Sequence, residues 1–193
     1  MARAALFLDR DGTIIADAHY PSHPDQVVLL DGAAAAIARA NQAQVPVVIV
    51  TNQSGIGRGH ITVAQYESVR DRVDALLAEH GAHVDASYYC PHWPDRDGPC
   101  ACRKPGIGMH TDAASALQLS LTASVYIGDR WRDVQPALTT GGLGILVPGE
   151  ETAFADITYA KAQHSSRVRV IDTVGEAVDA GLAWIHAARG GAS

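Results

Sequence analysis

The sequence predicts a three-layer α/β fold in which helices cover both faces of a parallel sheet. Short apolar runs of strand length alternate along the chain with longer stretches of helical periodicity, and this order is typical of parallel strands joined by crossover helices. Several of the apolar runs end in polar residues that can carry chemistry. Because such sheets bind ligands at the carboxyl ends of their strands, the sequence also predicts where a site should lie.

Four apolar runs have the length and composition of strands that are buried on both faces. Their near-continuous apolar character is what the middle of a parallel sheet requires. One further strand is expected between Thr51 and Arg103. The four runs are residues 4–8, 45–50, 124–127 and 143–147.

The helices expected between these strands show caps as well as apolar periodicity. Thr62 and Gln65 stand at the spacing of a capping box, and Thr173 and Glu176 repeat that spacing. Beyond Thr173, apolar residues recur every three or four positions and share one helical face. The expected helices are residues 32–44, 62–80, 109–119 and 132–140, and a last helix that starts near Thr173.

Length and composition exclude several classes of protein. The 193 residues suit one domain, and 47% hydrophobic with 19% charged residues is an ordinary soluble composition. A net charge of -6 gives no positive field that would recruit nucleic acid. No apolar run approaches the roughly 20 residues that span a bilayer. The first four residues lead directly into a strand and leave no room for a signal peptide, so we expect a cytoplasmic protein.

We expect residues 1–193 to form a single domain. Residues 90–102 make an inserted loop, and residues 150–193 make a C-terminal connection and helix. Within that last part, the weak periodicity of residues 150–166 indicates a surface connection, and residues 189–193 are expected to fray. Nothing suggests a subunit interface, so we expect a monomer.

Two carboxylates follow the first strand. Asp9 and Asp11 stand two positions apart and are followed by Gly12, which indicates a tight turn at the strand end. One carboxylate can attack phosphorus while the other handles the proton of the leaving group, because the two need not share one environment.

Three later segments supply groups that suit a phosphate and a metal ion. Thr51 and Asn52, at the end of the valine-rich strand, can donate hydrogen bonds to phosphate oxygens, although the same residues would also cap a helix. Arg103 and Lys104 bring local positive charge to an acidic protein. Asp129 follows another strand, as Asp9 does, and can complete an oxygen-rich magnesium site.

Asp133 allows two interpretations. It is a carboxylate that supports the site from behind, or an acid in the first turn of a helix, where the helix dipole favours it.

The ordered set of motifs resembles the haloacid dehalogenase superfamily of phosphatases. Within it, the set is similar to the branch that holds the heptose 1,7-bisphosphate 7-phosphatases and the histidinol-phosphate phosphatases. The resemblance covers about residues 4 to 148 and is highly specific as an ordered set. It rests on Asp9-Arg10-Asp11-Gly12-Thr13, Thr51-Asn52-Gln53, Arg103-Lys104-Pro105 and Gly128-Asp129.

The resemblance implies a phosphatase with a Rossmann-like fold and a catalytic magnesium ion. It implies Asp9 as the nucleophile and Asp11 as general acid and then base. Magnesium would be held by Asp9, the backbone carbonyl of Asp11, and Asp129. Thr51 and Lys104 would bind the phosphoryl group that is transferred.

The three cysteines of the chain belong to one pattern. Cys90, His92, Cys100 and Cys102 form C-x-H-x7-C-x-C, and three thiolates with one imidazole suit a closed, tetrahedral zinc site. Such a site has no open position for water, so this zinc would be structural. It would fold a polar loop that leads straight into Arg103 and Lys104. The resemblance independently implies the same zinc site.

The motifs leave no room for a separate cap domain, so loops must shape the substrate pocket. These are residues 13–25, residues 54–61 and the inserted loop 90–102. Asp17 and Tyr20 match the substrate-contact loop of the heptose branch, whereas Ala18 and His19 depart from it. Residues 51–59 match a second run of that branch except at Gly57. The candidate substrate residues are Asp17, Tyr20, Asn52, Gln53, Ser54, Arg58, Arg103 and Arg130.

Three hypotheses remain open from the sequence. The first is a phosphatase that removes the 7-phosphate of D-glycero-D-manno-heptose 1,7-bisphosphate, in which Arg58 or Arg130 anchors the distal phosphate. The second is a phosphatase for histidinol phosphate or another small sugar phosphate, because seven residues between His92 and Cys100 are intermediate between the two branches. The third is a zinc-stabilised phosphate-binding protein without turnover, against which the intact Asp9 and Asp11 pair argues.

Overall fold

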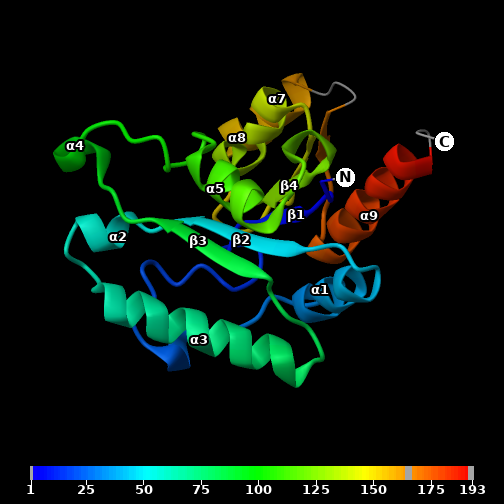
Figure 1. Cartoon of the computed structure of the whole chain (residues 1–193). Coiled ribbons are helices and arrows are strands. Elements are labelled where there is room, and N and C mark those ends of the chain that lie inside the picture. The colour runs from blue at the N-terminus through cyan, green and yellow to red at the C-terminus, as the bar shows by residue number, and fades with distance from the viewer. Residues whose placement is uncertain (1, 164–166, 191–193) are drawn as a thin grey trace.

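The computed structural model describes residues 2–163 and 167–190. Its centre is a six-stranded, wholly parallel sheet with the strand order β3-β2-β1-β4-β5-β6. The predicted α/β fold is therefore confirmed (Figure 1). The strands are β1 Leu6–Leu8, β2 Val47–Asn52, β3 Ala86–Cys90, β4 Val125–Gly128, β5 Leu143–Leu146 and β6 Val168–Val170.

Helices cover both faces of this sheet. Helices α1, α3 and α9 lie on one face, and α5, α6, α7 and α8 lie on the other (Figure 1). The short helices α2 and α4 belong to the loops beyond the strand ends, and two 3-10 turns span Pro24–Gln26 and Leu121–Ala123. The helices are α1 Ala33–Gln42, α2 Ser54–Gly57, α3 Val63–Glu79, α4 Pro94–Asp97, α5 Gly108–Leu117, α6 Trp131–Val134, α7 Pro136–Thr140, α8 Phe154–Ala162 and α9 Val174–Gly190.

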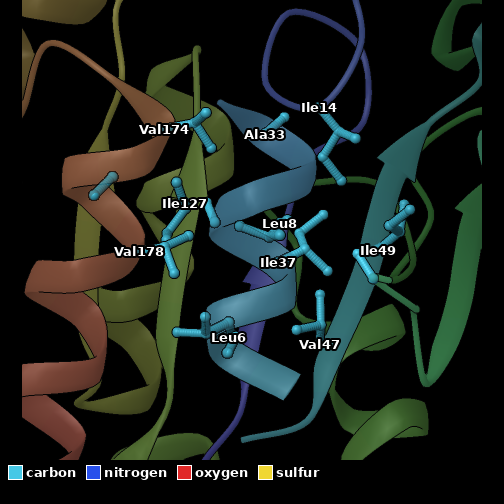
Figure 2. Packing of buried hydrophobic residues seen from close by; sticks show 14 of the residues in the cluster. Leu6, Leu8, Ile14, Ala33, Ile37, Val47, Ile49, Ile127, Val174 and Val178 are labelled. Atoms are coloured by element: carbon cyan, nitrogen blue, oxygen red, sulfur yellow. The ribbon is translucent and has the colours of Figure 1, made fainter. Parts of the chain in front are cut away.

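The central strands are buried on both faces, which explains their continuous apolar sequence. On one face, Leu6 and Leu8 of β1 pack against Ile37 of α1 and Val178 of α9 (Figure 2). Phe7, between them, points to the opposite face, because successive strand side chains alternate. The middle strands therefore pack mainly apolar side chains on both faces, and the charged side chains of Asp9 and Asp129 follow directly after the strand ends.

The capping box predicted at Thr62 and Gln65 is confirmed, and Thr173 caps the last helix as expected. The Thr62 side chain accepts a hydrogen bond from the Gln65 backbone N–H, and the Gln65 side chain accepts one from the Thr62 N–H. Thr173 likewise accepts from the backbone N–H of Glu176. These contacts satisfy backbone donors that the first turn of a helix leaves without partners.

Two predictions about element boundaries are wrong. The helix expected over residues 132–140 is two short helices, α6 and α7, which meet at Gln135 because Pro136 starts a new first turn. The connection expected over residues 150–166 contains helix α8, which packs on β6. The helix was not predicted because its sequence has no regular apolar stripe, and it packs on the sheet through Ile157 and Ala160. Residues 164–166 and 191–193 of the two expected irregular segments lie outside the described residues, and α9 runs on to Gly190.

Strand register brings the chemical groups together. Leu8 pairs with Ile49 on one side and with Ile127 on the other. Asp9 follows directly and its N–H donates to the Ile127 carbonyl at 2.9 Å, so Asp9 stands beside Asp129. Among the described residues, no helix combines the length and apolar character that crossing a membrane requires.

Candidate active site

A cleft of about 340 Å³ opens at the carboxyl edge of the sheet. It brings together every candidate catalytic, magnesium and substrate residue that the sequence indicated. Four further residues line it that sequence reasoning missed: His19, Pro21, Arg132 and Glu151. The expected residues are Asp9, Asp11, Asp17, Tyr20, Thr51, Asn52, Gln53, Ser54, Arg58, Arg103, Lys104, Asp129 and Arg130.

Lys104 is the buried cation at the floor of this cleft. Its amine lies 2.7 Å from Asp9 Oδ1 and 2.8 Å from Asp133 Oδ1, and it also donates to the Val50 carbonyl. Burial alone would lower the pKa of the amine, but the charges of Asp133 and Asp9 outweigh burial and raise it. Lys104 therefore stays protonated and places a fixed positive charge against Asp9.

Asn52 holds Lys104 in position through its backbone. The side-chain Nδ2 of Asn52 donates to the Lys104 carbonyl at 3.1 Å, and its Oδ1 accepts from the Lys104 N–H at 3.0 Å. The sequence interpretation gave Asn52 a role in binding substrate. In the structure, the side-chain NH2 and oxygen of Asn52 both bind the backbone of Lys104, and so they join the end of β2 to a segment 52 residues further along the chain.

The Asp11 carboxylate is surrounded by donors. Arg10 Nε and Nη2 each lie 3.0–3.2 Å from both of its oxygens. Gln53 Nε2 donates to Oδ2 at 2.8 Å, and Thr51 Oγ1 lies 3.4 Å from the same oxygen. Burial raises the pKa of Asp11, the charge of Asp9 adds to the rise, and Arg10 opposes it. Gln53 is one of the candidate substrate-binding residues. Its side-chain Nε2 donates hydrogen bonds to Asp11 Oδ2 and to Thr51 Oγ1.

Three buried carboxyl groups lie close together and suit a cation. Single oxygens of Asp9, Asp129 and Asp133 all lie within 4.8 Å of one another. Burial, and then the charges of Asp9 and Asp133, raise the pKa of Asp129 to about 8. Such mutual repulsion is relieved by a bound divalent cation, and Mg²⁺ prefers a few carboxylate oxygens.

Asp133 plays both parts that the sequence left open. Its Oδ1 pairs with Lys104, and its Oδ2 accepts the backbone N–H of Arg130 at 3.0 Å at the start of α6. Since both oxygens already have partners, Asp9 and Asp129 are the carboxylates best placed to ligate magnesium. Gly12 is needed beside them, because a Cβ on it would lie 2.7 Å from Asp129 Oδ2 and its φ is +78°.

The loops around the cleft pack on one another at glycines. A Cβ on Gly55 would lie 2.5 Å from the Tyr20 ring, so Tyr20 covers that glycine at the mouth of the cleft. A Cβ on Gly57 would lie 2.6 Å from the Pro91 carbonyl oxygen, which accepts the Gly57 N–H at 2.9 Å. The departure from the family run at position 57 therefore lets the inserted loop dock closely.

Arginines line the two sides of the cleft. On the side of the inserted loop, the Arg58 guanidinium lies 4.9 Å from the centre of the Trp93 ring, and Arg103 Nη1 donates to the His92 carbonyl at 3.5 Å. On the opposite side, Arg130 Nε pairs with Asp129 at 3.1 Å. The cleft thus offers positive charge away from Lys104, as an anionic substrate with two charged ends would need.

The cysteine and histidine side chains of the inserted loop converge on one point. Cys90 and Cys100 sulfurs lie 3.6 Å apart, and Cys102 lies 3.1 Å from Cys90 and 3.5 Å from Cys100. His92 Nδ1 lies 3.1 Å from the Cys102 sulfur. These separations exceed the S–S bond of about 2.05 Å in a disulfide. They approach the edge of about 3.8 Å in a tetrahedron with metal–sulfur distances near 2.3 Å.

Comparison with known proteins finds that the chain is similar to phosphatases. Residues 4–164 match the family model described as polynucleotide kinase 3 phosphatase. The D-glycero-beta-D-manno-heptose-1,7-bisphosphate 7-phosphatase of Mesorhizobium japonicum is 40% identical over 181 residues, which is 89% of this chain and 83% of that protein. The protein of the same name from Escherichia coli is 39% identical over 149 residues, 74% of this chain and 78% of that one.

A solved structure agrees in fold. The D,D-heptose 1,7-bisphosphate phosphatase of B. bronchiseptica, complexed with magnesium and phosphate, aligns with a TM-score of 0.79 and 35% identity over 92% of this chain and 97% of that one. The fold and the cleft define a magnesium-dependent phosphatase of the haloacid dehalogenase superfamily. Within that superfamily, the chain belongs to the family that includes the heptose 1,7-bisphosphate 7-phosphatases.

Proposed function

We propose that this phosphatase removes the 7-phosphate of D-glycero-D-manno-heptose 1,7-bisphosphate and leaves heptose 1-phosphate. The observation that carries the proposal is a single cleft that combines the Asp9–Lys104 pair at its floor with arginines on both sides. The names of the relatives at 39–40% identity support the same substrate.

The reaction proceeds in two steps through a phospho-aspartate. A carboxylate oxygen of Asp9 attacks phosphorus, the bond from phosphorus to the sugar oxygen breaks, and Asp11 gives its proton to that oxygen. Asp11 then accepts a proton from water as the water oxygen attacks phosphorus and frees the Asp9 carboxylate with inorganic phosphate. Lys104 and Thr51 stabilise the charge of the phosphoryl oxygens.

Magnesium would be held by Asp9, Asp129 and the backbone carbonyl of Asp11, and it would neutralise charge on the phosphoryl oxygens. The donor set fits this ion, because the buried Asp9 and Asp129 carboxylates lie together with Asp133 already paired to Lys104.

The sugar and the remote phosphate occupy the outer part of the cleft. Asp17, Tyr20 and Ser54 face the sugar, with Asn52 and Gln53 beneath it. The remote phosphate reaches Arg58, Arg103 or Arg130, where charge-assisted hydrogen bonds are strong. Binding of that group orients the reacting end, so its loss lowers kcat/KM.

The substrate assignment predicts a preference for the bisphosphate over histidinol phosphate. We expect kcat/KM to be higher for the bisphosphate by at least about 100-fold, which corresponds to about 2.7 kcal/mol of differential stabilisation. Histidinol phosphate lacks the remote phosphate and brings a cation toward the arginines instead. The measurement is kcat/KM for both compounds, with phosphorus NMR to show that the anomeric phosphate remains.

Two control substrates sharpen that comparison. Heptose 7-phosphate has the same reacting end without the remote phosphate, and it should lose most of the preference. A DNA strand with a 3′-phosphate tests the activity in the name of the matching family model. Equal or better use of histidinol phosphate, or of the DNA 3′-phosphate, would contradict the heptose assignment and leave only the phosphatase class.

The Cys3His cluster is part of the proposal as a structural zinc site. We expect about one zinc per chain by elemental analysis. Replacing Cys100 by serine should abolish zinc binding and lower Tm by on the order of 5 °C or more, because site formation is coupled to folding. Activity should fall with it and should not return when magnesium is added, since the loop carries Arg103 and Lys104. Zinc-free protein with unchanged Tm would rule out this site.

The remaining expectations belong to the same proposal. They are a single domain over residues 1–193, a monomer in the cytoplasm, and no nucleic-acid or membrane partner. One continuous sheet supports the single domain. Light scattering coupled to gel filtration measures the mass, which should correspond to one chain of 20.3 kDa.

A further inference from the structure

Arg10 is a buried cation that has no direct part in the two-step reaction of Asp9 and Asp11. Its side chain is 2% exposed, and the guanidinium lies 5.3 Å from the centre of the Tyr66 ring on α3. Arg10 does not line the cleft, whereas Asp11, its ion-pair partner at 3.0 Å, does. A buried charge is costly unless it is paired, and Asp11 is the carboxylate that pairs with this arginine.

We propose that Arg10 is a positioning residue that fixes the Asp11 carboxylate for proton transfer to the leaving group. The inference rests on the proposed role of Asp11 as general acid and base. Arg10 does not line the cleft, so its effect on the reaction would pass through its contacts with the Asp11 carboxylate.

The contacts of Asp11 carry the proposal. Arg10 Nε and Nη2 approach both carboxylate oxygens, so the planar guanidinium restrains the position and the tilt of the carboxylate. Gln53 adds a third restraint at 2.8 Å from Oδ2. Proton transfer requires the acid to lie within hydrogen-bond reach of the leaving oxygen, and a misplacement of about 1 Å can cost about 100-fold in rate.

The surroundings of Arg10 fix the guanidinium in turn. The Tyr66 ring, itself 4.2 Å from the Tyr89 ring, supports it from α3, and Tyr66 is 1% exposed. Among the described residues, Arg10 Nη1 has no hydrogen-bond partner, so the side chain is directed at Asp11 through Nε and Nη2 alone. A lysine at position 10 would carry the charge but could not restrain both oxygens.

The test uses leaving groups of different basicity. An alkyl phosphate such as the sugar 7-phosphate needs protonation of its leaving oxygen, whereas an aryl phosphate such as p-nitrophenyl phosphate needs little. Arg10→Met should lower kcat on the alkyl substrate by roughly 10- to 100-fold and on the aryl substrate by less than about 3-fold, with little change in KM. Arg10→Lys should lie between Arg10→Met and wild type. Arg70→Met, at an arginine of α3 whose side chain is 37% exposed and pairs with Asp71, is the matched control and should change neither rate.

A double variant separates this inference from the proposed function. Asp11→Asn alone should cost at least about 100-fold on the alkyl substrate and much less on the aryl one. Adding Arg10→Met to Asp11→Asn should change the alkyl rate by less than about 3-fold, because the group that Arg10 positions is already disabled.

The outcomes are distinguishable. If Asp11→Asn slows both substrates equally, Asp11 is not the general acid and the reaction scheme fails. If Asp11→Asn discriminates but the Arg10 variants slow both substrates equally, or their losses add fully to that of Asp11→Asn, the positioning role is overturned. If Arg10→Met does not fold, as Tm would reveal, the ratio of alkyl to aryl rates in Arg10→Lys decides alone.

Discussion

Replacing Asp9 by asparagine is expected to lower kcat by at least about four orders of magnitude. The amide keeps the size of the side chain but has no negative oxygen to attack phosphorus, and it is a weaker magnesium ligand. The fold should survive, because the backbone N–H of Asp9 still pairs with the Ile127 carbonyl and Lys104 keeps Asp133 as a partner. Steady-state turnover together with Tm measures both effects.

The matched control is Asp112→Asn, at an exposed carboxylate on α5, which should retain wild-type turnover. Beryllium fluoride, which mimics a phosphoryl group on a carboxylate, should bind the wild-type enzyme at Asp9 and should not bind the variant. Turnover near wild type in purified Asp9→Asn would exclude the covalent mechanism.

The second large effect is expected at Lys104. Lys104→Met keeps an unbranched side chain of nearly the same length but removes the positive charge that stabilises the phosphoryl oxygens, so kcat should fall by about 1,000-fold. The variant also leaves Asp9 and Asp133 buried without their common cation. We therefore expect magnesium-free protein to lose roughly 3 kcal/mol in the free energy of unfolding.

Lys161, in the last turn of α8, is the other lysine of the chain and is exposed. Lys161→Met therefore serves as the matched control, with unchanged turnover and stability. Denaturant unfolding without magnesium gives the stability difference, and turnover with saturating magnesium gives the rate. A Lys104→Met enzyme within tenfold of wild type would show that Lys104 does not stabilise the reacting phosphoryl group.

The sequence determined the fold class and the place of the site. Apolar runs that end in Asp9, Thr51 and Asp129 could be interpreted alone, because parallel strands necessarily present their carboxyl ends at one edge. The Cys3His pattern was also sufficient to predict a cluster, since ligand identity and spacing are local properties. Each strand end and each Cys/His pair is recognised from residues a few positions apart, and the parallel topology then brings the separate strand ends together.

Only the tertiary structure decided how the site is supported. Asn52 joins the backbone of Lys104, Gln53 joins Asp11, and Asp133 joins Lys104. These partners lie between 29 and 52 residues apart in the chain, and no periodicity or motif records which of several nearby polar groups a side chain will meet. Helix α8, strand β6 and the exposed Arg132 at the cleft were missed for the same reason. Their places depend on packing against the completed sheet, which exists only once the chain has folded.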